Sequence, residues 1–458
     1  MIQFGNRLKR AFRRDSTLAR MSRNVAWGLG SRGFNSVAGV IYLALAARTL
    51  GPKSFGEFVL ILTYGQMIAN FVQFQSWKGV IRYGALHVAG DRPDRLERLF
   101  GYTGTLDFGS AFVGMLIAAI GAPLIAPLFD WSPHQQLSAA LFGAVLLLST
   151  GATPTGMLRL FNRFDLVAYV EAVGPLMRLA GSVIAWMIGA HVNAFLSVWA
   201  AAGIGQALAQ WVAALVVNRT SIAFGPKPFR QAAQENEGIW RFMVQTNISN
   251  SITTFWLQLG TLAVGAFAGA ADAGAFRLAQ RLARGIVRPV RPVTVALYPE
   301  LARLVAEEDH AQLRKMAVRA TIVAGALALM VVLLTAVAGR EILGLLAGKR
   351  FEFAYAFLLL FSIATAIDLA GFAFEPFQDA HGRSWTVLRA RLVAAIAYAI
   401  LLATLVPWLG GKGAAIAAII CSALIFVQLA WATAMVLKRS PLETRMEEPD
   451  RAEQTTVS

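Results

Sequence analysis

Long apolar runs recur along almost the whole chain, and they limit what it can fold into more than any other feature. They begin near residue 24 and continue to residue 437. About 20 consecutive apolar residues suffice to cross the hydrocarbon core of a bilayer as a helix. The chain is 57% hydrophobic and only 15% charged, too little for the polar outer shell of a soluble protein. The sequence therefore predicts an all-α polytopic membrane protein with no separate soluble domain.

The apolar runs break at Gly, Pro, Asn, Asp and charge clusters into about twelve predicted transmembrane helices. The predicted spans are 24–48, 55–77, 104–129, 136–158, 165–190, 193–217, 240–268, 273–298, 317–338, 353–379, 384–407 and 413–437. This predicts a basic cytoplasmic segment over 1–23, an N-lobe over 24–217, a cytoplasmic connection over 218–239, a C-lobe over 240–437 and a disordered cytoplasmic tail over 438–458. We expect the N-terminal basic segment to lie on the membrane surface and the first apolar run to be an uncleaved helix.

The distribution of Lys and Arg tests the helix count independently, because cytoplasmic loops are enriched in these residues. Of the 42 basic residues, 29 fall on the side of the N-terminus when Arg241, Arg319, Arg389 and Arg391, near the inner ends of spans, are counted there, and seven others lie within spans. The other side has six, which are Arg48, Lys53, Arg340, Lys349, Arg350 and Lys412. The alternation predicts that both termini are cytoplasmic.

A faint internal repeat divides the spans into two sets of six. Gly51, Gly56 and Phe58 follow the first span at the same spacing at which Gly269, Gly274 and Phe276 follow the seventh. Both copies fall on a predicted outer loop that opens the second helix of a set. Two six-helix lobes in the same orientation imply a pseudo-twofold axis along the membrane normal, with a site between the lobes.

Composition and motifs argue against several classes of function. The net charge of +16 would suggest nucleic acid in a soluble protein, but here the charges lie on membrane-flanking loops, so we expect no nucleic-acid partner. Cys421 is the single cysteine and lies within the last span, and the five histidines lack ligand spacing. No phosphate-binding glycine loop, zinc motif or nucleophile elbow occurs on a suitable loop. We therefore expect no enzyme, no metal and no cofactor.

Five arginines follow one another along the predicted eighth span at intervals of four, three, four and three residues. They are Arg277, Arg281, Arg284, Arg288 and Arg291. This spacing places them on one face of an α-helix, over about 21 Å of its length. An arginine near the bilayer centre costs roughly 2.5–3.5 kcal/mol on insertion scales, so such a stripe must face water, a counter-charge or an anionic ligand.

The arginines of this stripe differ in whether snorkelling to the membrane interface, without any functional role, can explain them. Arg288 and Arg291 lie beside prolines near the inner end, where they either snorkel to the interface or contribute to the site. Arg281 and Arg284 are too central for snorkelling, which favours a functional or ion-paired role. The interval of four and three residues does not fit a voltage sensor, which needs an arginine at every third position.

Span ten has acidic residues that could balance the stripe. Asp368, Glu375 and Asp379 share one helix face, and the first two are deep enough to be either structural counter-charges or proton sites. Glu171 and Arg178, two turns apart on span five, are a further possible counter-charge or ion-coupling pair.

Polar amides concentrate on spans two and seven. They are Gln66, Asn70 and Gln73 on the former and Gln245, Asn247, Asn250 and Gln258 on the latter. Such faces suit sugar hydroxyls, although ordinary helix–helix hydrogen bonding explains them almost as well.

Several motifs along the chain carry a family resemblance. RTLGPKSFGEF follows the first span, and GAFRLAQRLARGIVRPVRPVTVALYPELARL contains the stripe and a Tyr-Pro pair at Tyr298 and Pro299. QDAHGRS and LVPWLGGKGAAIAAI follow in the last third. In this order they resemble the polysaccharide and oligosaccharide flippases of the MOP superfamily, relatives of the MATE exporters.

The resemblance implies a flippase of the bacterial inner membrane that moves an undecaprenyl-diphosphate-linked oligosaccharide, a repeat unit of O-antigen, capsule or exopolysaccharide, to the periplasmic leaflet. It implies alternating access between the two lobes around a cationic cavity, an H+ or Na+ gradient as a possible driving force, and polymerase and glycosyltransferases of the same pathway as possible partners. Diphosphates and acidic sugars are anions that arginine binds well. Arg32, on the first helix, is then the cross-lobe companion of Arg277, Arg281, Arg284 and Arg288.

Two other classes of function remain as alternatives. A MATE-like, ion-coupled exporter of small cationic molecules would share the fold but should have an acidic cavity. A membrane scaffold or membrane-embedded glycosyltransferase is the other alternative, although no sizeable loop carries acidic catalytic or metal-binding residues.

Overall fold

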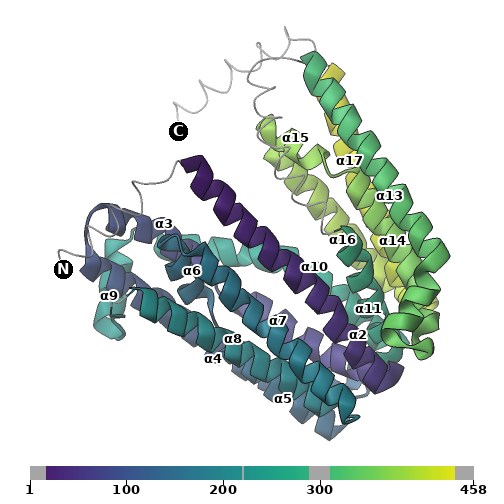
Figure 1. Cartoon of the computed structure of the whole chain (residues 1–458), viewed down its shortest axis with the longest axis horizontal. Coiled ribbons are helices and arrows are strands. Elements are labelled where there is room, and N and C mark those ends of the chain that lie inside the picture. The colour runs from purple at the N-terminus through teal and green to yellow at the C-terminus, as the bar shows by residue number, and fades with distance from the viewer. Residues whose placement is uncertain (1–16, 219–220, 288–309, 439–458) are drawn as a thin grey trace. The chain divides into compact units, whose positions relative to one another are not determined.

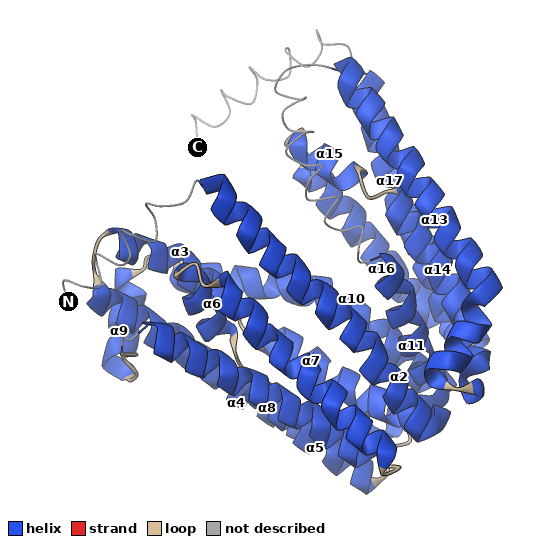
Figure 2. Cartoon of the chain, viewed as in Figure 1, coloured by secondary structure: helices blue, strands red, loops and turns tan. Residues whose placement is uncertain are grey.

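The computed structural model describes residues 17–218, 221–287 and 310–438, apart from some side chains within the helices, and this part of the chain is helical with no strand (Figure 2). The first helices are α2 (Thr17–Val72), α3 (Ser76–Ala89), α4 (Pro93–Ile125), η1 (Ala126–Leu128), α5 (Pro133–Leu148), α6 (Ala152–Leu160), α7 (Phe164–Met187), α8 (Val192–Asn218) and α9 (Pro226–Glu235). They are followed by α10 (Ile239–Ala268), α11 (Ala270–Val287), α13 (His310–Ala347), η3 (Lys349–Ala354), α14 (Tyr355–Ala370), α15 (Phe374–Ala380), α16 (Ser384–Leu409) and α17 (Gly411–Lys438).

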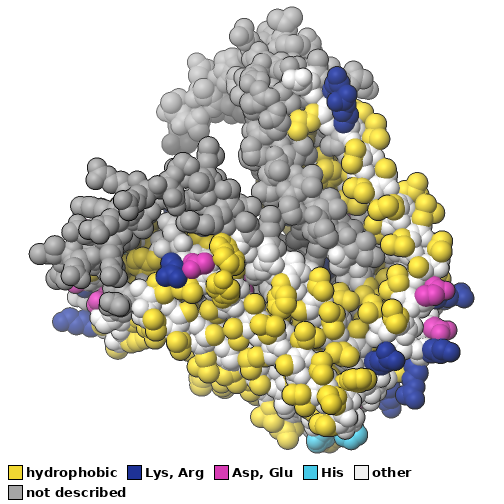
Figure 3. Space-filling model, viewed as in Figure 1, with side chains coloured by type: hydrophobic (Ala, Val, Ile, Leu, Met, Phe, Trp, Pro, Cys, Tyr) yellow, Lys and Arg dark blue, Asp and Glu magenta, His cyan; other side chains and the backbone are white. Residues whose placement is uncertain are grey.

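Nine helical stretches of the described residues are long and apolar enough to cross a membrane, which confirms a polytopic all-α protein. Hydrophobic side chains cover much of the described surface visible in Figure 3, as a lipid-facing surface requires. The count of twelve, the lobe boundaries and the cytoplasmic placement of the termini stay predictions. The tail after residue 438, and most of the basic N-terminal segment, lie outside the described residues.

Helices and predicted spans differ most at the start of the chain. The first two spans follow each other directly within α2, as two helical parts joined by a kink at Gly51, whose backbone is not helical, and no loop separates them (Figure 1). Gly51 has φ 72° and ψ 172°, a conformation open to glycine but strained for other residues. Pro52 follows directly and lacks the N–H that an unbroken helix would need at that turn.

The predicted fourth span is interrupted between α5 and α6, at residues 149–151. Neighbouring helices satisfy the polar groups exposed there: the Trp211 indole on α8 donates to the carbonyl of Thr150 at 3.1 Å. At the second residue of α6, the backbone N–H and hydroxyl of Thr153 donate to the Asp107 carboxylate of α4 at 2.9 and 2.7 Å. Ser76 of α3 also donates to Asp107, so this buried carboxylate joins α3, α4 and α6.

The predicted connection after span six contains a short helix, α9, that the sequence analysis missed. It has ten residues of mixed polar and apolar type, too few and too polar to be predicted as a transmembrane helix. Phe229 of α9 stacks on Tyr102 of α4 with ring centroids 4.4 Å apart. Arg98 and Glu235 join the same two helices through two hydrogen bonds of 3.0 and 2.6 Å. The contacts of α9 therefore make it a packed part of the first unit.

The two copies of the sequence repeat have the same backbone and pack on each other. Gly51 and Gly269 have nearly equal dihedral angles, with φ of 72° and 86° and ψ of 172° and 173°. A Cβ added to Gly56 would lie 1.8 Å from the carbonyl oxygen of Ala270, and one added to Gly274 would lie 2.9 Å from the Cα of Gly56. The glycines of the repeat thus permit the α2 and α11 backbones to touch.

The chain forms two compact units. The first comprises residues up to Arg281 together with Leu343–Ala354, and in it α4 packs on α5 and α7 on α8 (Figure 1). The second comprises Leu282–Ile342 and the residues from Tyr355 onward, in which α17 packs on α14 and α16. α11 begins in the first unit and ends in the second.

Candidate functional site

α11 presents three arginines of the predicted stripe within the described residues. Gly269 ends α10 with a left-handed φ, and α11 then carries Arg277, Arg281 and Arg284 at intervals of four and three residues on one face. Arg277 and Arg281 are half-buried in the first unit, and Arg284 is exposed in the second. Arg288 and Arg291 lie outside the described residues, as does the side chain of Arg32 on α2.

The guanidinium of Arg281 lies against a bare patch of backbone on α2. A Cβ added to Gly39 would be 2.0 Å from Nη2 of Arg281, so only glycine at this position leaves room for the guanidinium. One turn further along α2, the hydroxyl of Tyr42 accepts a hydrogen bond from the same nitrogen at 3.3 Å. Gly39 and Tyr42 together form a seat for this guanidinium.

An aromatic contact fixes the tyrosine of that seat. The Tyr42 ring meets Trp199 of α8 edge-to-face, with centroids 5.1 Å apart. Trp199 in turn meets Phe58, from the second part of α2, at 5.0 Å. All three side chains are buried, so the phenol hydroxyl is held in place by rigid rings.

Arg277, one turn before Arg281, contacts a group of amides. Its Nη2 donates to Oε1 of Gln66 at 3.3 Å, and its Nη1 donates to Oε1 of Gln280 at 3.4 Å. Gln258 of α10 donates to the same Gln66 oxygen at 3.3 Å. Two of the amides predicted on spans two and seven therefore meet beside the stripe.

α10 also carries buried polar atoms that the described residues leave without a hydrogen bond. The Gln258 amide oxygen and, one turn later, the Thr261 hydroxyl are buried without a hydrogen-bond partner among the described residues. Buried polar groups of this kind carry a desolvation cost and can bind a polar ligand.

The charge of Arg281 is not neutralised within the described chain. A guanidinium has five N–H donors, and the Tyr42 hydroxyl is the one acceptor that the described residues offer to it. That hydrogen bond is long and its acceptor is uncharged. Arg281 thus keeps donors and a full positive charge for an anionic group.

The acidic residues predicted on span ten lie in the second unit. Asp368 of α14 hydrogen-bonds Ser422 of α17 and lies within electrostatic range of Arg284. Glu375 of α15 pairs instead with Arg391 of α16, with Nη2 and Oε2 2.7 Å apart. Asp379 accepts from Ser384 at 2.7 Å. Glu375 thus has a basic partner on α16, and Asp368 is the acid that lies near the stripe.

Glu171 and Arg178, predicted on span five, have separate surroundings. Glu171 lies 3.3 Å from Nη2 of Arg159 on α6 and accepts a hydrogen bond from Ser31 of α2 at 3.0 Å. Arg178 is half-buried, and its Nε has no partner among the described residues. The pairing of Glu171 with Arg159 makes it part of the first unit's framework.

Several residues of the site gave no signal in the sequence. Gly39 and Tyr42 are ordinary residues of an apolar span, and only their spacing of one helical turn would have placed them together. Arg159 and Arg391 were counted among the cytoplasmic loop charges. No group of three or more potential metal ligands occurs within the residues that the structure describes.

Comparison with protein families and curated proteins places the chain among membrane proteins of glycan synthesis. A family profile described as "Polysaccharide biosynthesis protein" matches residues 21–305. Inner membrane protein YghQ of Escherichia coli (strain K12) is 28% identical over 344 residues, which cover 74% of this chain and 96% of that protein.

Solved structures of transporters have the same fold. The lipid II flippase MurJ, in an inward closed conformation, superposes with a TM-score of 0.64 at 13% identity, covering 92% of this chain and 88% of that one. An inward-facing multidrug resistance transporter of the MATE family, in the MOP superfamily, gives 0.62 at 14% identity and covers 93% and 100%. A variant of the Vibrio cholerae MATE transporter VcmN gives 0.56 at 13% identity and covers 93% and 99%.

Proposed function

The chain belongs to the polysaccharide biosynthesis protein family, and from this premise we propose that it turns a lipid-linked oligosaccharide over from the cytoplasmic to the periplasmic leaflet. It is a multi-pass inner-membrane protein and a flippase or transporter of the MOP type. The proposal concerns its substrate, an oligosaccharide on a polyprenyl diphosphate, and a cationic site that binds the diphosphate during alternating access.

The observation that carries this proposal is the state of Arg281. It is half-buried on a helix that belongs to a membrane-embedded fold, and the partner that the described part of the chain gives it is a neutral hydroxyl. An uncompensated guanidinium in a low-dielectric setting attracts a phosphate strongly, and its planar donors fit two phosphate oxygens at once. Arg277 adds a second cation one turn away on the same helix face.

The amides beside the stripe suit the sugar part of such a substrate. Gln66, Gln258 and Gln280 offer both donors and acceptors, which sugar hydroxyls require. MurJ, a fold relative, is described as a lipid II flippase, which supports a lipid-linked glycan as the class of substrate.

Charge reversal at the stripe tests the proposal. In a strain that depends on this chain, Arg281→Glu should lower export of the glycan by about 100-fold or more, because a favourable charge contact of a few kcal/mol becomes repulsive. Surface glycan and accumulated lipid-linked precursor are measured together with the amount of protein in the membrane. Arg340→Glu is the matched control, since Arg340 lies over the Tyr355 ring in the second unit. Normal export by Arg281→Glu would disprove the cationic site.

A MATE-like exporter of small molecules is the alternative that the fold allows. Such a transporter would move cationic compounds, and a cationic stripe would repel them. Drug susceptibility of a sensitised strain separates the two functions: the flippase predicts no change on deletion, and the exporter predicts increased susceptibility.

A further inference from the structure

A second basic site lies away from the stripe, where the bend of α2 meets the segment between α13 and α14. The residues that line this pocket are Ala47, Arg48 and Gly51 of α2 and residues 347–351 of the opposing segment, and all belong to the first unit. Its volume is about 230 Å³, well above the roughly 30 Å³ that one water molecule occupies in the liquid. The pocket can therefore hold a phosphate-sized group.

Two left-handed glycines and two arginines build the pocket reciprocally. Gly51 faces Arg350, and a Cβ added there would lie 3.6 Å from its Nη1. Gly348, with φ 90°, faces Arg48, and an added Cβ would lie 3.9 Å from its Cγ. An arginine of each segment thus packs against a glycine of the other segment.

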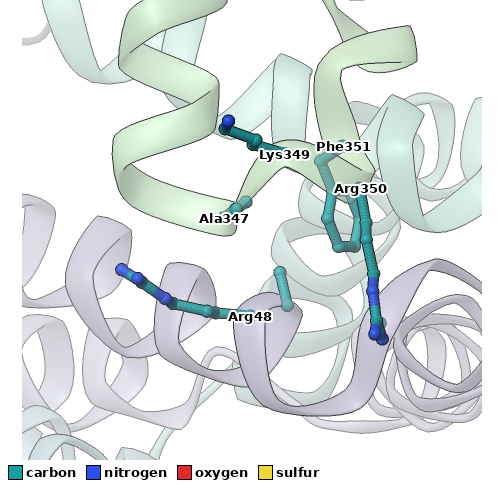
Figure 4. A pocket seen from close by; sticks show the side chains of 8 residues that line it. Arg48, Ala347, Lys349, Arg350 and Phe351 are labelled. Atoms are coloured by element: carbon teal, nitrogen blue, oxygen red, sulfur yellow. The ribbon is translucent and has the colours of Figure 1, made fainter.

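Aromatic packing makes the floor of the pocket rigid. Phe351 is fully buried and meets Phe55 of α2 edge-to-face, with centroids 5.6 Å apart. Arg48 and Lys349 extend to the same side with Ala347 between them, and Arg350 extends on the other side, near Phe351 (Figure 4). The backbone is preorganised, and the cationic side chains are free to adjust around a ligand.

The positive charges of the pocket are not balanced within the described chain. Arg48 donates to the carbonyl of Leu345 at 3.4 Å, a long contact with a neutral group. Lys349 and Arg350 are exposed and have no hydrogen-bond or ion-pair partner among the residues that the structure describes. Glu57 of α2 and Glu352 of η3 lie on the same segments, yet within the described chain neither of them forms an ion pair.

The placement of these charges departs from the bias of the rest of the chain. The predicted outer side carries six basic residues, and Arg48, Lys349 and Arg350 are half of them. Outer loops are generally poor in Lys and Arg, so three such residues around one pocket are a local departure from this bias.

We propose that this pocket binds the phosphate group of a lipid at the outer surface of the membrane. Two lipids share that chemistry: an anionic phospholipid, through its headgroup, and a polyprenyl-diphosphate-linked glycan, through its diphosphate. Arginine and lysine form charge-assisted hydrogen bonds with phosphate oxygens, so the pocket could bind the phosphate of either lipid. The site does not rest on the proposed function, although binding of the diphosphate would extend it.

Binding to the purified full-length chain in detergent tests the proposal with two probes, short-chain phosphatidylglycerol and farnesyl diphosphate. The pocket variant is Arg48→Gln combined with Arg350→Gln. The control is Arg340→Gln combined with Lys412→Gln, which removes the same charge from the same predicted side outside the pocket. Titrations give the affinity for each probe, and thermal unfolding shows whether each variant is folded.

We expect the pocket variant to bind at least one probe tenfold or more weakly than both the wild type and the control. Tighter wild-type binding of phosphatidylglycerol identifies a phospholipid headgroup site, and tighter binding of farnesyl diphosphate identifies a carrier site. Lys349→Glu, at an exposed position that cannot disturb the core, should weaken binding in the same direction. Equal affinities of wild type, pocket variant and control for both probes would overturn the proposal. Because no transport is measured, this result is independent of the export test at Arg281.

Discussion

Arg159 and Arg281 are both half-buried arginines of the first unit, but their surroundings differ in charge. Arg159 lies 3.3 Å from the Glu171 carboxylate, and its Cζ lies 4.7 Å from the centre of the Trp77 ring. Arg281 meets a phenol hydroxyl and the backbone of a glycine. Among the residues that the structure describes, a carboxylate neutralises the first arginine, and no acidic group pairs with the second.

The difference separates a structural role from a ligand-binding one. A buried cation with a carboxylate partner joins helices. Removing either partner leaves the other as an unpaired charge in a low-dielectric environment, which costs stability. A buried cation seated on neutral groups costs the protein stability unless a ligand supplies the counter-charge. We therefore expect changes around Arg159 to affect stability and changes around Arg281 to affect transport.

After charge reversal of Arg281 itself, the largest effect is expected when the seat of Arg281 is filled without any change in charge. In Gly39→Ala the added methyl would fall 2.0 Å from Nη2, so the guanidinium must leave its place beside Tyr42. Loss of a correctly placed charged contact of about 1.5–3 kcal/mol corresponds to roughly 10–100-fold slower export. Glycan export per folded protein measures this.

The same helix provides the control for that experiment. Gly33→Ala adds a methyl to α2 where nothing lies within 4 Å. Alanine favours a helix over glycine by about 1 kcal/mol, so both variants should fold at least as well as the wild type. Equal export by Gly39→Ala and Gly33→Ala would show that transport does not depend on the position of the Arg281 guanidinium. Arg281 would then not differ from Arg159 in having a role in transport.

An intermediate effect is expected at Arg159, and on a different quantity. Arg159→Gln should lower stability by about 1 kcal/mol, because the pair is a quarter exposed and its charges are partly screened. Glu171→Gln should cost a similar amount, and the double variant should cost less than the sum of the two. Thermal unfolding of the purified proteins measures all three. Export per folded protein should be unchanged, and a loss of export at full stability would move Arg159 into the transport site.

The sequence predicted the membrane-embedded helices, the repeat and the arginine stripe, because each depends on periodicity or composition along the chain. The conformations of Gly51 and Gly269 follow from that repeat. The seat at Gly39 and Tyr42 could not be predicted, since it arises where α11 packs on α2 and neither residue stands out in an apolar span. The partners of Glu171 and Glu375 were missed for a similar reason: Arg159 and Arg391 lie close to helix ends, where basic residues normally flank a membrane.

The smallest effect is expected where a stripe arginine does have an acid within electrostatic range, at Arg284 and Asp368 in the second unit. We propose that Asp368, which hydrogen-bonds Ser422, couples transport to protons. In proteoliposomes, an acidic exterior should then accelerate wild-type export a few-fold, and Asp368→Asn should abolish this acceleration while basal export persists. Glu375→Gln is the control, because Glu375 is already paired with Arg391 and should leave the response to pH intact. A wild type that ignores the pH gradient would exclude proton coupling and would favour sodium or exchange driven by the lipid gradient.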